Sequence, residues 1–196
     1  MSKIVVKNVF KKFNHQVVLN DINLELTSGH IYGLAGINGS GKTVLMKCIC
    51  GLSTPTQGCV EIDDKKIGKD IDFPESIGVL IETPGFIEHY SALDNMISLA
   101  SIKNKTCKEQ VIALLNKVGL DPYEKKRVKK YSLGMRQKLG IAMALLDKPD
   151  IVILDEPFNA LDKKSVINVK NIILQLKEEN RLVIISSHDG SLLEEI

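Results

Sequence analysis

Two kinds of hydrophobic pattern occur along this chain, and both indicate β-strands. Residues 3–9 and 17–26 indicate strands, and within the second the apolar and polar residues alternate over 22–26, which is typical of a strand with one buried and one solvent-facing side. A hairpin is expected over residues 59–67, where two short apolar runs flank the turn Asp63-Asp64. Short continuous apolar runs, which indicate strands buried on both faces, occur at residues 31–35, 77–81, 151–154 and 182–185.

Apolar residues three or four positions apart indicate helices between these strands. One helix is expected over 42–50, where Gly51 ends it, and a second over 162–177. The second helix would face inward with Val166, Val169, Ile173 and Leu176. The last residues, 191–196, are typical of the start of an amphipathic helix.

The pattern between the strand at 77–81 and the strand at 151–154 is helical. Ser91 with Asp94 resembles an N-terminal capping pair. Thr106 with Glu109 predicts a capping box at the start of a further helix, whose apolar stripe is Val111, Leu114, Leu115 and Val118.

These patterns together predict an α/β fold in one domain that spans residues 1–196. A core of mostly parallel strands, with an antiparallel β-subdomain near the N-terminus, is expected from residues 1–83 and 149–196. A helical subdomain, residues 84–148, would be inserted between these two parts of the core.

Composition narrows the possible classes of protein. The 196 residues are 44% apolar, which is enough for a real core and excludes a disordered chain. A net charge of +2 gives no strong electrostatic attraction to nucleic acid, and no nucleic-acid partner is expected. The chain shows no signal peptide and no apolar run of about 20 residues, so we expect it to be soluble by itself. Four cysteines in a chain this long suit a reducing cytosol.

A glycine-rich turn joins the apolar run 31–35 to the helix expected over 42–50, and it matches the phosphate-binding loop (P-loop) pattern. Glycines let successive N–H groups point at phosphate oxygens, and the helix N-terminus adds positive potential. Lys42 would meet the β- and γ-phosphates, and the Thr43 hydroxyl could bind Mg²⁺. The alternative is a glycine-rich turn with a chance lysine. The residues expected to hold nucleotide here are Gly36, Asn38, Gly39, Ser40, Gly41, Lys42, Thr43 and Val44.

Two carboxylates directly follow the buried run 151–154. Ligands of open α/β sheets bind at the carboxyl ends of the strands, which is where Asp155 and Glu156 would lie. Asp155 would then belong to the Mg²⁺ shell, and Glu156 would be the general base that accepts a proton from attacking water. The alternative is a strand end with two solvated acids.

Three further motifs complete an ordered set. Residues 131–137 read Tyr-Ser-Leu-Gly-Met-Arg-Gln, residues 159–162 read Asn-Ala-Leu-Asp, and residues 186–188 read Ser-Ser-His. With the phosphate loop and the acidic pair, this set resembles the ATPase subunits of ABC transporters over nearly the whole chain. The Ser-Leu-Gly-Met variant and residues 80–86 (Leu-Ile-Glu-Thr-Pro-Gly-Phe) look like the bacitracin-resistance and lantibiotic-immunity exporter group.

The resemblance implies roles for residues outside the phosphate loop. Ser132 and Gly134 match the signature motif, which contacts the γ-phosphate bound in the opposite subunit. Asp162 matches the motif for communication between subunits, and His188 matches the switch histidine that reads the γ-phosphate. For Ser132 and Asp162 the alternative is a plain helix N-cap, and capping and interface contact can coexist. For His188 the alternative is a solvated loop histidine.

Two aromatic residues compete for one further role that the resemblance implies. Phe13 lies where the family places an aromatic ring on adenine. A core phenylalanine between two strands is the alternative for Phe13, and Phe10 is a rival for the stacking role.

This chain departs from the family pattern at Glu82, at Leu133 and Met135 of the signature motif, and at its end. Glu82 stands where most members carry a glutamine that touches Mg²⁺ and the attacking water, and a carboxylate there is a harder Mg²⁺ ligand that adds negative charge near the phosphates. The chain also stops at Ile196, where family members continue, which indicates a truncated chain or an absent C-terminal module.

The resemblance therefore implies a Mg²⁺-dependent ATPase, with Glu156, His188, Lys42 and Glu82 as its catalytic residues and Thr43, Glu82 and Asp155 around the metal. Its expected partners are ATP, a separate transmembrane permease, and a second copy of the chain or a similar ATPase. It would lie in the cytoplasm, peripheral on the inner face of the cell membrane, and drive export of a peptide antibiotic or similar amphipathic compound. The alternatives are a soluble ABC-type ATPase in assembly or nucleic-acid maintenance, and a small-molecule kinase.

Overall fold

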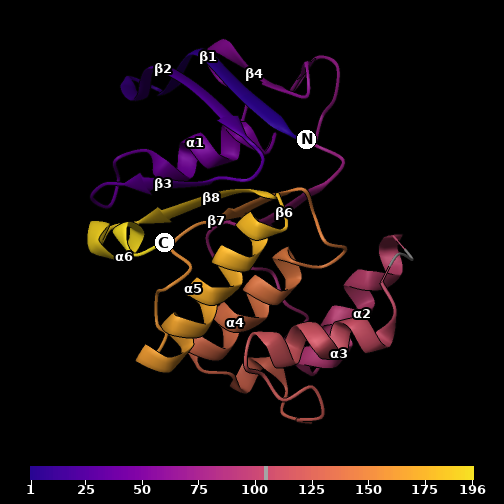
Figure 1. The fold of residues 1–196 in the computed structure, drawn as a ribbon. Helices are drawn as coiled ribbons and strands as arrows, with labels where there is room; N and C mark the ends of the chain where they lie inside the picture. Colours follow the sequence, from indigo (N-terminus) through magenta and orange to yellow (C-terminus); the bar gives the residue numbers. More distant parts are fainter. Residues whose placement is uncertain (104–105) are drawn as a thin grey trace.

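The computed structural model describes residues 1–103 and 106–196, which form two sheets and the helices around them (Figure 1). The antiparallel sheet has the order β2-β1-β4-β5, and the parallel sheet has the order β3-β8-β7-β6. The antiparallel strands are β1 (Lys3–Phe13), β2 (Gln16–Thr27), β4 (Gln57–Ile62) and β5 (Lys65–Lys66). The parallel strands are β3 (Ile31–Ala35), β6 (Ile77–Leu80), β7 (Ile151–Leu154) and β8 (Leu182–Ser187). The α/β fold class expected from the hydrophobic pattern is confirmed.

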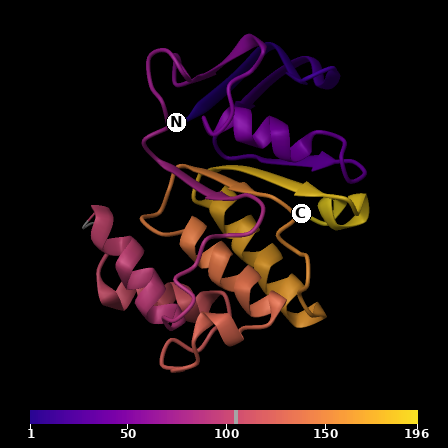
Figure 2. The same ribbon diagram turned by 180° about the vertical axis from the view of Figure 1, so that it is seen from behind.

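The helices cover the parallel sheet from both sides. Helix α1 lies between the two sheets, whereas α4 and α5 lie on the opposite face of the parallel sheet, as the reverse view in Figure 2 also shows. The helices are α1 (Lys42–Ile49), α2 (Ala92–Lys103), α3 (Lys108–Lys117), the 3-10 helix η1 (Val128–Lys130), α4 (Leu133–Ala144), α5 (Lys163–Glu178) and the short α6 (Gly190–Glu194). None of the helices in the described part of the chain is long and apolar enough to span a membrane.

The two central strands, β7 and β8, divide their side chains between two hydrophobic clusters, because successive residues of a strand point to opposite faces. One cluster, with α1 and the antiparallel sheet, contains Ile151, Ile153, Leu182 and Ile184. The other cluster, with the helices on the far face, contains Val152, Leu154, Val183 and Ile185. The expectation of strands buried on both faces is therefore confirmed for β7 and β8.

The same expectation is wrong for β3. This strand is an edge of the parallel sheet, and its residues are half-buried or exposed along its whole length. The position of a strand in the sheet determines how far a short apolar run is buried. The sequence of the run alone does not show whether the strand is central or at an edge. Strand β6 is the other edge and is only partly buried.

The capping box predicted for α3 is wrong by one residue. Cys107 is the N-cap, and its backbone N–H donates to the Gln110 side chain at 3.0 Å. Thr106 instead donates its hydroxyl proton to the Asp147 carboxylate, so a contact with the end of α4 occupies the side chain that the local pattern assigned to the cap. The capping pair of Ser91 and Asp94 is confirmed at the start of α2.

Helix α4 packs directly on β6 through a glycine. A Cβ atom added at Gly78 would lie 1.7 Å from the carbonyl oxygen of Ala144. The absence of a side chain at Gly78 therefore lets the C-terminal end of α4 approach the edge of the sheet.

Candidate functional site

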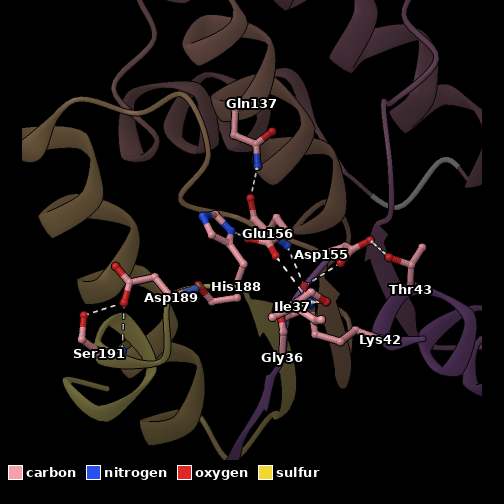
Figure 3. A network of polar contacts seen from close by, with 12 residues as sticks. Gly36, Ile37, Lys42, Thr43, Gln137, Asp155, Glu156, His188, Asp189 and Ser191 are labelled. Carbon is pink, nitrogen blue, oxygen red and sulfur yellow. Dashed lines mark hydrogen bonds and ion pairs between the residues drawn. The ribbon is translucent and has the colours of Figure 1, made fainter. Parts of the chain in front are cut away.

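The phosphate-loop residues lie between β3 and α1, and here the loop curls around the Lys42 side chain (Figure 3). The Lys42 ammonium donates to the carbonyl oxygens of Gly36 at 2.5 Å and Ile37 at 3.1 Å. A hollow of about 180 Å³ opens beside the loop, and Asp155 and Glu156 line its far side. The loop thus places the Lys42 side chain, which is 10% exposed, in the wall of a small cavity.

Two glycines of the loop cannot carry a side chain without displacing their neighbours. Gly41 has a φ of 95°, and a Cβ there would lie 2.9 Å from the carbonyl oxygen of Val18. A Cβ at Gly36 would lie 2.8 Å from the Ser40 hydroxyl oxygen. The glycines therefore let the loop turn tightly against β2 and keep its amides close to any bound anion.

Asp155 lies at the end of β7, between hydroxyl groups from the two sides of the site. Thr43 donates its hydroxyl proton to one carboxylate oxygen at 2.7 Å, and Ser186 donates to the other at 2.5 Å. Because β7 pairs with β8 in parallel, Ser186 lies level with the end of β7. The Asp155 carboxylate is therefore fixed beside the first turn of α1.

Glu156 follows in a left-handed backbone conformation, with a φ of 49°. Its amide donates to the Ser186 hydroxyl oxygen at 2.9 Å, and its carbonyl accepts from the Gln137 amide at 3.0 Å. Both main-chain bonds hold this unusual backbone geometry, which costs on the order of 1–3 kcal/mol outside glycine. The geometry turns the Glu156 side chain toward the phosphate loop, as Figure 3 shows.

The two carboxylate oxygens of Glu156 have different surroundings. Oε2 lies 2.8 Å from His188 Nδ1. Oε1 is buried, has no hydrogen-bond partner among the described residues and lies 3.9 Å from Lys42 Nζ. A buried acceptor without a donor is costly, so a donor that reaches this oxygen would stabilise the site.

His188 lies just beyond β8, and about half of its side chain is exposed. Asp189, the next residue, caps the short helix α6 by accepting from the Ser191 amide at 3.0 Å and the Ser191 hydroxyl at 2.6 Å. The pKa of Asp189 is lowered, first by these hydrogen bonds from Ser191. His188 is thus partly solvated, as the alternative of a loop histidine expects, but its ring also contacts Glu156.

Glu82 lies two residues beyond β6 and is turned away from this network. Its carboxylate pairs with Lys47 of α1 at 2.5 Å. Among the described residues, its polar contacts include neither Thr43 nor Asp155. The structure thus pairs Glu82 with a lysine that stands one turn after Thr43 on the same face of α1.

Ser132 and Asp162 are both helix N-caps, as the sequence predicts. The Ser132 hydroxyl oxygen accepts from the Met135 amide at 3.2 Å at the start of α4. The Asp162 carboxylate accepts from the Ser165 amide at 2.8 Å at the start of α5, and this bond is the main cause of its lowered pKa. A Cβ at Gly134 would lie 2.6 Å from the Ala160 carbonyl oxygen, so the start of α4 packs closely on the segment before α5.

Phe13 lies at the end of β1 with 49% of its surface exposed. The Lys11 ammonium lies 4.9 Å from the centre of its ring. The alternative of a core phenylalanine between two strands is therefore wrong for Phe13. Phe10, its rival, is half-buried within β1.

Three residues of this site were not singled out from the sequence. Ser186 is the first residue of the Ser-Ser-His motif, and the parallel pairing of β8 with β7 was the signal for its contact with Asp155. Gln137 ends the Ser-Leu-Gly-Met-Arg-Gln motif and reaches the backbone of Glu156. Lys47 follows Thr43 by four positions, which places both on one face of α1.

Comparison with known proteins places this geometry in a family. Residues 19–159 match the family model described as ABC transporter. An ABC transporter ATP-binding protein of Bacillus subtilis (strain 168), YybJ, is 42% identical over 94% of this chain and 85% of that protein. The structure of MJ0796, described as a dimeric bacterial ABC transporter cassette, superposes with a TM-score of 0.87 at 26% identity, over 97% of this chain and 90% of that one.

Two transport proteins of named cargo are also similar. The bacitracin transport ATP-binding protein BcrA of Enterococcus faecalis is 39% identical over 98% of this chain, which spans 63% of that protein. The lantibiotic transport ATP-binding protein SrtF of Streptococcus pyogenes is 36% identical over 97% of this chain, which spans 82% of that protein. The chain therefore belongs to the ABC transporter family, and it is an ATP-binding, ATP-hydrolysing subunit of that family.

Proposed function

We propose that this ATPase drives a membrane exporter of a peptide antibiotic or a similar amphipathic compound. The support is its similarity to BcrA and SrtF, whose names give bacitracin and lantibiotics as cargo. The observation that carries the chemistry is the convergence of Lys42 and Glu156 on one small hollow, with His188 in contact with Glu156.

The phosphate loop would hold the triphosphate of ATP. Phosphate oxygens can replace the carbonyl groups of Gly36 and Ile37 as partners of the Lys42 ammonium, because these contacts are with neutral acceptors. Loop amides and the N-terminus of α1 would bind the remaining oxygens. The exposed ring of Phe13 is suited to stack on the adenine.

Glu156 would act as the general base. Glu156 lines the hollow, and its carboxylate would accept a proton from a water molecule that attacks the γ-phosphorus there. His188 would hold the other carboxylate oxygen and reach the γ-phosphate with its free ring nitrogen. Lys42 and His188 would stabilise negative charge on the transferred phosphoryl group.

The residues around Thr43 and Asp155 fit Mg²⁺. Among the described residues, no three His, Cys, Asp or Glu side chains gather as a metal cage. Mg²⁺ does not require such a cage, because it binds through one or two protein oxygens, water and substrate phosphates. The Thr43 hydroxyl and the Asp155 carboxylate, 2.7 Å apart, are such oxygens, and bound Mg²⁺ would neutralise charge on the β- and γ-phosphates. Glu82 would join this shell only after leaving Lys47.

A second copy of the chain, or a similar ATPase, would complete the site. Leu133 is 74% exposed, so the start of α4 is open to a partner. Ser132 and Gly134 would meet the γ-phosphate bound to the opposite subunit, and Asp162 would lie at the contact between subunits. Dimeric packing of the MJ0796 cassette supports this arrangement.

We further propose that residues 84–148 act as a helical subdomain inserted into a core of residues 1–83 and 149–196. The loop around Glu82 joins the two, and it would pass the closing and opening of the dimer to a separate transmembrane permease. The chain would then lie at the inner face of the cell membrane.

Co-expression with a permease tests this proposal against the soluble assembly ATPase. The chain would be produced with a membrane protein of about six apolar spans from the neighbouring gene, and its phosphate release would be measured with and without Mg²⁺. We expect the two proteins to co-purify from membranes and cells to become more resistant to bacitracin or a lantibiotic. An active ATPase that never associates with any neighbouring membrane protein would contradict the transport proposal.

A further inference from the structure

The ion pair between Lys47 and Glu82 lies at the edge of the site, beside α1 and the loop after β6. Lys47 Nζ lies 2.5 Å from Glu82 Oε1, and Lys47 is partly buried with 29% of its side chain exposed. Among the described residues, neither side chain has another ion-pair partner. The Glu82 backbone is left-handed, with a φ of 57°, so the loop after β6 holds a conformation that glutamate rarely adopts.

The fold brings this pair next to the phosphate site. Lys47 stands one helical turn after Thr43 on α1. Glu82 stands two residues after Leu80, whose carbonyl accepts from the Asp155 amide at 2.7 Å. The carboxylates of Asp155 and Glu82 therefore extend from neighbouring strand ends toward successive turns of one helix.

An acid at position 82 creates an electrostatic problem for a site that binds a triphosphate. A free carboxylate repels phosphate oxygens, and screening by water reduces this repulsion without removing it. The Lys47 ammonium cancels the charge of Glu82 in the contact observed. It also joins the loop after β6 to the helix that begins at the phosphate loop.

We propose that Lys47 is a positioning residue: it neutralises Glu82 and holds this carboxylate on α1, away from the phosphate site. This inference rests on the proposed nucleotide site. Loss of the Lys47 charge leaves a free acid beside the triphosphate, and this acid weakens nucleotide binding. Replacement of Glu82 in addition to Lys47 restores nucleotide binding, because the negative charge that Lys47 neutralises is then gone.

A double-mutant cycle on nucleotide affinity tests the proposal. Binding of a non-hydrolysable ATP analogue would be measured for the wild type, Lys47→Gln, Glu82→Gln and the double variant, with and without Mg²⁺. We expect Lys47→Gln to weaken binding about fivefold without Mg²⁺ and by less with it, since a divalent cation offsets the repulsion. The double variant should bind within about twofold of Glu82→Gln. Lys47→Arg, which keeps the charge, should bind within about twofold of the wild type.

A matched exposed pair provides the control. Lys3 and Glu25 form an ion pair at 2.6 Å between β1 and β2, and Lys3→Gln should leave the affinity unchanged. Equal weakening in Lys47→Gln and in the double variant would overturn the proposal, because Lys47 would then act on the fold and not through Glu82. Wild-type affinity in Lys47→Gln would overturn it as well. A wild-type chain that binds no nucleotide would instead refute the proposed function on which the inference rests.

Discussion

His188 Nδ1 lies 2.8 Å from Glu156 Oε2, and this contact joins the end of β8 to the end of β7. The same carboxylate turns its other oxygen toward Lys42 at 3.9 Å. The Glu156 carboxylate thus lies between the His188 ring and the Lys42 ammonium. His188 holds one oxygen of this carboxylate, and the other is buried without a hydrogen-bond donor among the described residues.

Glu156→Gln should bind nucleotide and turn it over slowly. Glutamine keeps the size of the side chain but cannot accept a proton from water at neutral pH, so we expect phosphate release to fall at least about a hundredfold. The affinity for a non-hydrolysable ATP analogue should change by less than about threefold. Phosphate release and analogue binding would be measured side by side, with the exposed Glu178→Gln as control. Turnover near the wild-type rate would exclude Glu156 as the base.

Lys42→Ala should abolish tight nucleotide binding. The variant loses the ammonium that the loop encloses, and charge-assisted hydrogen bonds to phosphate are about twice as strong as neutral ones. We expect the ATP analogue to bind at least about tenfold more weakly, as measured by calorimetry. Lys65→Ala, at an exposed ion pair on β5, serves as control and should bind normally. Unchanged affinity in Lys42→Ala would refute the assignment of this loop as the phosphate-binding loop.

Gly78→Ala should destabilise the fold strongly. The added methyl group would lie 1.7 Å from the Ala144 carbonyl oxygen, so α4 must move away from β6. We expect a loss of about 3 kcal/mol in the free energy of unfolding, which urea denaturation would measure. Gly190→Ala is the matched control, because a Cβ there meets no atom of the described residues within 4 Å. Similar stability of the two variants would mean that α4 is not packed closely on β6.

We expect Asp162 to make the free energy of unfolding depend on pH under acidic conditions. Hydrogen bonds from Ser165 lower the pKa of this carboxyl in the folded chain. The stabilisation is therefore present above the unfolded pKa of about 4 and is lost as the pH falls through the lower folded value. Asp162→Asn keeps an N-cap without the titrating charge.

The Asp162→Asn test compares urea unfolding at about pH 6 and about pH 3. The wild type should lose more stability than Asp162→Asn between these two values. Parallel losses in the two proteins would show that the cap charge does not contribute to acid sensitivity.

Local pattern was sufficient to locate most elements and the chemistry that they carry. Strands β1 and β2, the apolar runs of β7 and β8, and the phosphate loop can each be recognised within about ten residues, because backbone geometry and burial produce their sequence patterns locally. The caps at Ser132 and Asp162 are equally local, since a cap bonds an amide three residues away.

Contacts between distant segments were decided by the tertiary structure. The order of the sheet makes β3 an edge strand. The Thr106 hydroxyl donates to Asp147, 41 positions away in sequence, and so does not form the expected helix cap. The contacts of Ser186 with Asp155 and of Lys47 with Glu82 join residues 31 and 35 positions apart. Such pairs depend on how strands and helices pack, and a pattern that repeats every two to four residues carries no information about that packing.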